Sequence, residues 1–427
     1  MSPRPPKPKK QEFNRSVHGA RGLFSSAVYV FHVVNSGLPT FSLLATPLAL
    51  FGLRTTEFGV EAFFCISGFV ISGALRRARS PASFLTDRAI RIFPVLWATI
   101  LTIGLLGFVT RLEGFAGRSV GWFLLWLPAN LLALPGFFHL PLYHPAAWSL
   151  SYEAMFYLAC SGGWWLASRR GRATFWLGVP LACLVLALYP RAIYFLAGVI
   201  VAEGLIDGRW AAPFTRYPVA MLLAFLACWR GVQLLSRPTP LTMSTMFEWT
   251  HDMRLPLAVL AFAAATFGLA GLASGRGLFG RFLRLPVMQY LGTISYSFYL
   301  WHPIVMAGVK HEMMVTGVVR AVGPGAQAVF FVLALPPSLI VAHYSQIVLE
   351  RGAGRWLRAR LHHPAPLVVR AQAVHPTLTG VAPAGAEPLG AVAAVSGGGL
   401  DATAAAAAVA AAVTGGSDTA AAPFSGR

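Results

Sequence analysis

Long apolar segments dominate the pattern of hydrophobic and polar positions along this chain. An apolar helix of about 20 residues is long enough to cross a bilayer. Ten segments approach or exceed that length: residues 22–44, 58–75, 92–110, 146–168, 173–189, 191–206, 217–235, 255–274, 287–309 and 325–348. The pattern therefore predicts an all-α polytopic membrane protein with about ten transmembrane helices.

One further apolar stretch, residues 121–138, differs from these ten. Pro128 and Pro135 interrupt it, and proline removes a backbone donor and breaks or kinks a helix. We therefore expect an interfacial or re-entrant segment here and not an eleventh span.

The composition and the distribution of charge agree with a membrane location. Hydrophobic residues make up 56% of the chain, charged residues 11%, and the mean hydropathy is +0.62, which is too apolar for a soluble domain of this length. With the N-terminus inside, 23 Lys and Arg residues fall in inner segments and 9 in outer ones. This is the positive-inside bias. It predicts cytoplasmic termini, and it explains the net charge of +19 without a nucleic-acid partner.

The two ends of the chain differ from its middle. Residues 1–20 are basic and proline-rich, and we expect a cytoplasmic segment rather than a cleaved signal peptide, because cleavage would remove or truncate the apolar stretch after Arg21. Residues 21–360 form the predicted membrane domain. Residues 361–427 are rich in Ala, Gly, Pro and Val with few charges, which predicts a disordered tail.

The four cysteines do not predict a disulfide framework or a metal site. All lie in apolar segments without ligand-like spacing, at positions 65, 160, 183 and 228. Free cysteines in such surroundings behave as small buried hydrophobes.

The first apolar segment carries two polar groups on one side. Arg21 and His32 are eleven residues apart, about three helical turns and about 16 Å along the axis. Both side chains therefore share one face, and a span beginning near residue 22 would place His32 roughly halfway across the hydrocarbon. Ionisable residues at that depth are costly and usually functional, although a neighbouring carbonyl could also satisfy a histidine there.

Polar residues in three other segments are candidates for function. Arg88 and Arg91 are neighbours on one predicted helix surface, where they suit either membrane anchoring or phosphate binding. Glu153 follows Trp148 inside an apolar run, and a buried carboxylate must pair, protonate or react. The third candidate is a polar stripe formed by Ser295, Tyr299 and His302.

Small residues in the second predicted span have a simpler explanation. Ser67, Gly68, Ser72 and Gly73 allow close approach of another helix, and Glu61 stands at the outer end of this span. Helix packing is the more economical interpretation of the Ser-Gly pairs.

Together these segments resemble one protein family. In order, the chain reads RGLFSSAVYVFH, GVEAFFCISGF, FLTDRAIRIFP, WSLSYEAMFY and LGTISYSFYLWHP. This order and wording are similar to the acyltransferase-3 family of bacterial integral-membrane acyltransferases, over about residues 15–360. The Arg-to-His spacing of the first segment matches the signature of that family.

The resemblance implies a ten-helix enzyme of the bacterial inner membrane that moves an acyl group, acetyl or succinyl, from acyl-CoA to a hydroxyl. A sugar of a cell-surface or exported polysaccharide or glycolipid is the expected acceptor, and a secreted natural product such as a macrolide is the alternative. Arg21, Arg88 and Arg91 match the residues implicated in donor binding, and His32 and Glu153 those implicated in catalysis. We expect the acceptor beside four residues of the fourth and ninth spans: Trp148, Ser295, Tyr299 and His302. No metal is expected.

The chain departs from the family pattern near its last span. Such proteins usually carry a tyrosine a few residues before Glu-x-Pro, but here Gly352 replaces the proline and Tyr344 is displaced. A role for Glu350 is therefore open. The extra hydrolase-like domain of some members is absent from this sequence, whose tail is short and simple.

Two points stay open from the residues themselves. His32 could act as a general base or carry the acyl group as an acyl-imidazole. A proton-coupled transporter would also place His and Glu inside spans, but it predicts internal repeats with broken helices, and the motif regions do not repeat between the halves. A membrane scaffold would leave His32 and Glu153 unexplained.

Overall fold

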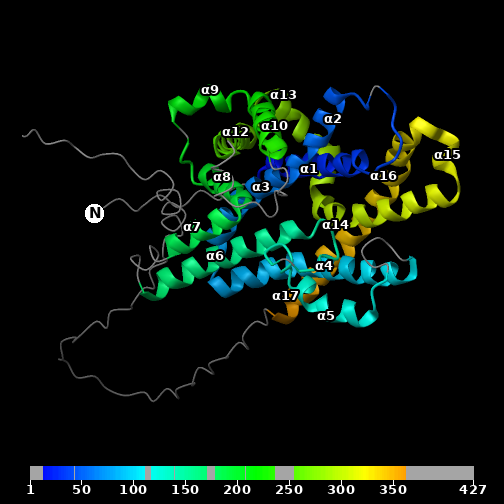
Figure 1. The fold of residues 1–427 in the computed structure, drawn as a ribbon. Coiled ribbons are helices and arrows are strands. Elements are labelled where there is room, and N and C mark those ends of the chain that lie inside the picture. Colours follow the sequence, from blue (N-terminus) through cyan, green and yellow to red (C-terminus); the bar gives the residue numbers. More distant parts are fainter. Residues whose placement is uncertain are drawn as a thin grey trace, which may run out of the picture.

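The chain folds into helices (Figure 1). The computed structural model describes residues 13–42, 44–110, 117–138, 140–170, 178–206, 208–235 and 254–361, and no strand occurs within them. Residues 1–12 and, apart from Leu361 at the end of α17, the predicted tail lie outside the described residues. The principal α-helices are α1 Arg15–Val34, α2 Pro47–Arg54, α3 Gly59–Arg77, α4 Pro81–Thr110, α5 Val120–Leu131, α6 Trp148–Arg170, α7 Gly178–Leu188, α8 Ile193–Ala202, α9 Ala212–Thr215, α10 Pro218–Leu235, α12 Arg254–Ala273, α13 Gly277–Leu283, α14 Pro286–Val315, α15 Val318–Val322, α16 Ala326–Ser345 and α17 Gly354–Leu361.

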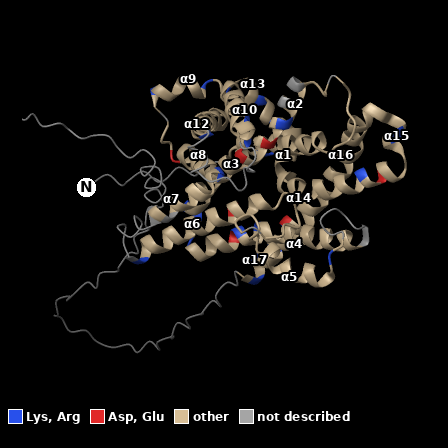
Figure 2. Ribbon diagram, in the orientation of Figure 1, with Lys and Arg blue, Asp and Glu red and all other residues tan. Residues whose placement is uncertain are grey.

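Five helical segments of the described residues are long and apolar enough to cross a membrane: Gly52–Arg77, Pro81–Phe108, Pro218–Leu235, Arg254–Ala273 and Val318–Leu361. A sixth is counted if the bent pair α7 and α8 forms one span. The all-α membrane class is therefore supported, while ten spans and cytoplasmic termini stay predictions. Figure 2 shows how few charged residues interrupt these helices.

Several predicted ranges are confirmed as helices. The ranges 58–75, 217–235 and 255–274 agree with α3, α10 and α12 to within two residues at each end. The stretch 121–138 contains only a twelve-residue helix, α5, with Pro128 inside it. This length is too short for a span of about 20 residues, in agreement with the interruption predicted there.

The first helix corrects the predicted range 22–44. It begins at Arg15, because the Asn14 side chain accepts a hydrogen bond from the Val17 N–H (3.0 Å) and caps the helix. It ends at Val34, and Gly37 then turns the chain with φ of +74°. His32 therefore lies in the last turn of α1 and not midway along a longer helix. Residues 15–20 belong to the helix rather than to an N-terminal extension.

The predicted spans 173–189 and 191–206 also need correction. Their described parts form α7 and α8, of 11 and 10 residues, or about 15 Å each at 1.5 Å per residue. The two helices meet near Pro190 at 120°. Such a pair forms one broken span or a re-entrant loop and not two straight spans.

Glycines set the closest helix pairings. A side chain on Gly22 of α1 would come within 2.7 Å of Leu291 on α14, and one on Gly292 would overlap the His18 carbonyl oxygen. Small residues of this kind let helix backbones approach closely. α1 and α14 therefore run side by side and parallel, with residue 22 near 292 and residue 29 near 298.

A second glycine pair joins α3 to α8. A side chain on Gly68 would overlap the Phe195 carbonyl oxygen, and one on Gly198 would overlap that of Cys65. The packing interpretation of Gly68 is thus confirmed. Ser72 donates to the Gly68 carbonyl within its own helix.

The last membrane helix continues beyond its predicted end at 348. α16 passes into an eight-residue π-helix, Gln346–Ala353, and then into α17. π-Helical segments are rare and frequently occur at functional sites. The π-helix carries Glu350, for which the sequence left the role open.

Candidate functional site

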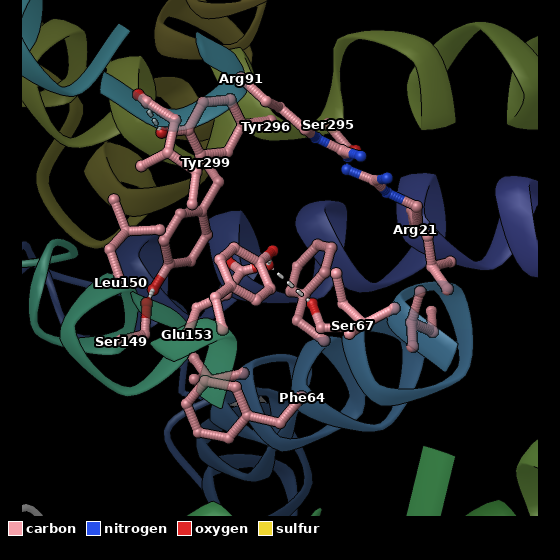
Figure 3. Close-up of a pocket in the computed structure, with 17 residues that line it drawn as sticks. Arg21, Phe64, Ser67, Arg91, Ser149, Leu150, Glu153, Ser295, Tyr296 and Tyr299 are labelled. Atoms are coloured by element: carbon pink, nitrogen blue, oxygen red, sulfur yellow. Dashed lines mark hydrogen bonds between the residues drawn. The ribbon is translucent and has the colours of Figure 1, made fainter. Parts of the chain in front are cut away.

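A narrow cavity of about 60 Å³ lies among α1, α3, α4, α6 and α14 (Figure 3). A volume of this size holds a few water molecules or a slender chain. Its walls are formed by Arg21, Val60, Phe63, Phe64, Ile66, Ser67, Val70, Ile71, Arg91, Ile92, Ser149, Leu150, Glu153, Tyr157, Ser295, Tyr296 and Tyr299. Five predicted site residues from four separate segments thus meet in one place: Arg21, Arg91, Glu153, Ser295 and Tyr299.

Two arginines face each other at one end of this cavity. Figure 3 shows the guanidinium groups of Arg21 and Arg91 pointing toward one another from α1 and α4. Neither makes an ion pair or a hydrogen bond within the described residues, and the Arg21 Nε is shielded from solvent without a partner there. Like charges held this close repel each other. The arrangement is therefore suited to an anion that both arginines bind.

Glu153 lies deeper in the same cavity, on α6. Its Oε1 accepts hydrogen bonds from the Ser67 hydroxyl of α3 (3.0 Å) and from the Tyr157 hydroxyl one turn further along α6. These two hydroxyl groups hold the carboxyl group at a fixed position between α3 and α6. The structure leaves Glu153 partly buried, not fully buried as the sequence predicted.

Glu350 supplies a second acid that the sequence did not place. Its carboxylate accepts a hydrogen bond from Ser297 on α14 (2.6 Å), and both Arg21 and Arg91 act on it electrostatically. The π-helix therefore brings Glu350 toward the arginine pair even though Gly352 replaces the proline of the family pattern. An acidic residue just after the last predicted span was the available signal in the sequence. Its proximity to Arg21 could not be predicted, because the two residues are far apart along the chain.

The predicted polar stripe of α14 lies only in part on the cavity wall. Ser295 and Tyr299 line the cavity. The Tyr299 hydroxyl pairs with Ser149 (2.9 Å) and donates to the Ala146 carbonyl (3.1 Å), both in the segment that leads into α6. His302 lies outside the cavity, with its ring 6.3 Å from the Tyr299 ring.

Three histidines gather beyond Tyr299. The rings of His32 and His302 lie 5.1 Å apart between centroids, and His144 interacts electrostatically with both. His144, which the sequence did not single out, is fully buried and bonded at both nitrogens, to the Leu300 carbonyl (2.6 Å) and to the Ala146 N–H (3.1 Å). The signature pair of α1 thus spans the site, with Arg21 in the cavity and His32 in the histidine cluster.

Besides His32 and His302, two more predicted site residues lie away from the cavity wall. Arg88 lies over the Phe84 ring at 5.9 Å, and it interacts electrostatically with Arg91. Trp148 lies under the Arg191 guanidinium, 4.2 Å from its ring centroid, because an indole face attracts a cation. This packing places Trp148 beside a buried ion pair instead of on the cavity wall.

That ion pair joins Glu61 to Arg191. The Glu61 Oε1 accepts from two nitrogens of Arg191, through Nε at 2.7 Å and through Nη2, and both side chains are almost fully buried (0% and 1% exposed). The charge count placed Arg191 among the nine outer cations, at the start of the predicted span 191–206, but the structure buries it. In the sequence, Arg191 stands alone between two apolar runs, and Glu61 lies in an apolar run without a nearby cation. These two isolated charges could have indicated the pair.

The described residues contain no group of three or more His, Cys, Asp or Glu side chains that could hold a metal ion.

Comparisons with known proteins identify the family of this chain. The family model described as an acyltransferase domain matches residues 14–343. The chain is 31% identical to the exopolysaccharide production protein ExoZ of Rhizobium meliloti (strain 1021) over 338 residues, which is 71% of this chain and 92% of that protein.

Two other relatives are more distant or shorter in extent. Acyltransferase MdmB of Streptomyces mycarofaciens is 27% identical over 340 residues, 70% of this chain and 80% of that protein. Nodulation protein 10 of Rhizobium leguminosarum bv. viciae is 41% identical over 61 residues, 14% of this chain and 17% of that protein. No solved structure matches the chain. The family model covers most of the chain and includes the cavity, so this protein is a membrane acyltransferase of the acyltransferase-3 family.

Proposed function

We propose that this enzyme moves an acyl group, acetyl or succinyl, from acyl-CoA to a hydroxyl of a sugar in an exported or cell-surface polysaccharide or glycolipid, in the bacterial inner membrane. The observation that supports this most strongly is the pair of facing, unpaired arginines at the end of a narrow cavity. A polyanionic donor with a thin reactive arm fits such a site.

The donor phosphates bind at Arg21 and Arg91. A guanidinium binds phosphate through two parallel hydrogen bonds, and an anion between the two groups converts their repulsion into two attractions. Arg88 lies behind Arg91 and adds positive charge to this end of the site. The three arginines predicted from the sequence thus share one donor site.

The acyl arm occupies the cavity itself. The wall is mostly apolar, with Phe63, Phe64 and Ile71 among its residues, and the narrow volume accommodates a linear chain better than a nucleotide. Arg21 and His32 are about three helical turns apart on one face of α1, about 16 Å. The pantetheine arm therefore runs from the arginine pair past Glu153 and Tyr299 toward His32.

His32 carries out the transfer in one of two ways. As a general base it takes the proton of the acceptor hydroxyl, whose oxygen attacks the thioester carbonyl while the C–S bond breaks. As a nucleophile it holds the acyl group as an acyl-imidazole before the hydroxyl attacks. Glu153 orients groups in the cavity through its fixed carboxylate, and Ser295 and Tyr299 line the path to the acceptor.

The proposed class of acceptor is inferred from similarity to a known protein. The relative from Rhizobium meliloti that covers most of this chain is described as an exopolysaccharide production protein, which favours a polysaccharide hydroxyl. A secreted natural product such as a macrolide is the alternative acceptor, since it also offers a hydroxyl at the membrane.

The test is acyl-CoA turnover by the purified protein in nanodiscs. Acetyl-, succinyl- and propionyl-CoA are compared for the wild type, His32→Ala and Arg21→Ala. We expect His32→Ala to lose turnover, by about 100-fold or more for a lost general base, while Arg21→Ala mainly weakens donor binding. His311→Ala and Arg209→Ala alter exposed residues and serve as matched controls. Normal turnover in His32→Ala, or no donor binding by the wild type, would exclude this function.

A further inference from the structure

The ring of His302 is completely buried on the α14 face toward α1. Its Nδ1 lies 2.8 Å from the Phe298 carbonyl oxygen. A carbonyl oxygen can only accept, so Nδ1 carries the proton and Nε2 of the neutral ring carries a lone pair. This Nε2 is buried and has no hydrogen-bond partner within the described residues. A buried acceptor without a donor is costly, and its position therefore requires an explanation.

The polar groups around His302 are already occupied, with one exception. The Tyr29 hydroxyl donates to the Phe331 carbonyl (3.0 Å), and the Tyr299 hydroxyl pairs with Ser149 and Ala146. His144 is bonded at both ring nitrogens. Tyr29, Tyr299 and His144 therefore have no free donor for the His302 Nε2.

His32 is the exception. Its ring lies 5.1 Å from that of His302, tilted by 54°, and it makes no hydrogen bond in the part of the chain that the structure describes. At this separation the rings are in contact, so a small rotation brings an N–H of one to the lone pair of the other. A neutral imidazole always has one N–H to give.

We propose that His302 is a positioning residue for His32, with its Nε2 accepting the N–H of His32. This bond fixes the tautomer and the ring orientation of His32, and it leaves the second His32 nitrogen unprotonated toward the substrate. The inference rests on the proposed function and revises the expectation that His302 contacts the acceptor. It is the role that an orienting group plays for a catalytic histidine.

The proton balance follows directly. In direct transfer the free His32 nitrogen takes the proton of the acceptor hydroxyl, a C–O bond forms at the acyl carbon, and the C–S bond breaks. The departing thiolate then receives the proton from His32 as CoA is released. His302 keeps its own Nδ1 proton, bonded to Phe298, throughout.

The first test compares His302→Gln with His302→Leu. A glutamine oxygen can replace the Nε2 acceptor, while leucine removes it at similar volume. We expect the maximal turnover of His302→Leu to fall about 100-fold with unchanged acyl-CoA affinity, and His302→Gln to recover at least about a tenth of wild-type turnover. His311→Leu, on the same helix, is the control. Wild-type turnover in His302→Leu would overturn the proposal.

A double-variant cycle separates positioning from simple packing. If His302 acts through His32, adding His302→Leu to His32→Ala lowers turnover no further. Multiplied losses would show that His302 acts independently of His32 and would overturn the inference.

The last readout needs no catalysis. Nitrogen-15 spectra of histidine-labelled protein in nanodiscs should show one fixed tautomer for His32 in the wild type and in His302→Gln, and a mixture in His302→Leu. A mixture in the wild type would overturn the positioning role. If the wild type shows one tautomer but turns over no acyl-CoA, the proposed function fails while the contact stands.

Discussion

Two arginines inside this protein occupy contrasting surroundings. Arg191 is almost fully buried, binds Glu61 through two nitrogens and lies over Trp148. Arg21 has a shielded Nε without a partner in the described residues and faces a second cation, Arg91. A buried charge held in a direct ion pair maintains the fold, whereas one without a hydrogen-bonded partner beside a cavity is available for a ligand. The difference in partners distinguishes the two roles.

The helices that line the cavity also differ from one another. Each of the five segments that are long and apolar enough to cross a membrane contains a long stretch with few charged residues. α1, α6 and α14 have 20, 23 and 30 residues but do not belong to that set. These three helices hold Arg21, Glu153 and Tyr299. The cavity thus lies between these three helices and two of the apolar segments, α3 and α4, which contribute Ser67 and Arg91.

The largest effect is expected from Arg191→Leu. This change leaves the Glu61 carboxylate buried without its cation, which costs about 3–5 kcal/mol of the free energy of unfolding. Thermal unfolding in nanodiscs measures the loss. The double variant Glu61→Leu with Arg191→Leu should recover most of the stability, because the fully buried carboxylate is removed with its cation and Glu57, the other acid near Arg191 (3.8 Å), is partly exposed. An Arg191→Leu protein as stable as the wild type would contradict the structural role of the pair.

The next effect is expected from Arg21→Ala, on ligand binding instead of stability. One charge-assisted hydrogen-bond donor to phosphate contributes about 1.5–3 kcal/mol, so CoA affinity should fall about 10- to 100-fold. The thermal midpoint without ligand should stay close to that of the wild type, because Arg21 has no ion pair to lose. If Arg21→Ala lowered the amount of folded protein and left CoA affinity unchanged, Arg21 would be a structural residue like Arg191.

A smaller effect is expected from Ser67→Ala. It removes one of the two hydroxyl donors to Glu153, and such a bond contributes about 0.5–1.5 kcal/mol. Turnover should fall several-fold while Tyr157 still holds the carboxylate. Steady-state kinetics with saturating acyl-CoA measures this, and Ser168→Ala, at the exposed end of α6, is the control. A total loss of turnover would mean that Ser67 contacts the substrate itself.

The smallest expected effect is that of Arg91→Gln on the free energy of unfolding of the ligand-free protein. Removing one of two facing cations relieves repulsion, so the free energy of unfolding should rise slightly, by about 0.5 kcal/mol at partly exposed sites. CoA should then raise the thermal midpoint less than it does for the wild type. A lower midpoint without ligand would reveal a stabilising partner of Arg91.

The sequence predicted what depends on local pattern. The helices α3, α10 and α12 follow from uninterrupted apolar runs, and the one-sided stripe of Ser295, Tyr299 and His302 follows from helical periodicity. These features need only the neighbouring residues along the chain.

The features that were missed depend on contacts between distant segments. The partner of Glu61 is 130 residues away, so Arg191 resembled a loop cation. His32 and His302 are brought together by the parallel register of α1 and α14, which glycines 22 and 292 determine. Glu350 reaches the arginine pair through a π-helix that no sequence period announces.

CoA binding to purified protein is the most direct test of the contrast between the two arginines. Calorimetry compares the wild type, Arg21→Ala, Arg91→Ala and Arg209→Ala in nanodiscs at low and high salt. We expect the first two variants to lose affinity about 10- to 100-fold and to show a weaker salt dependence, with Arg209→Ala unchanged. Equal CoA affinity in all four proteins would contradict a donor site between Arg21 and Arg91.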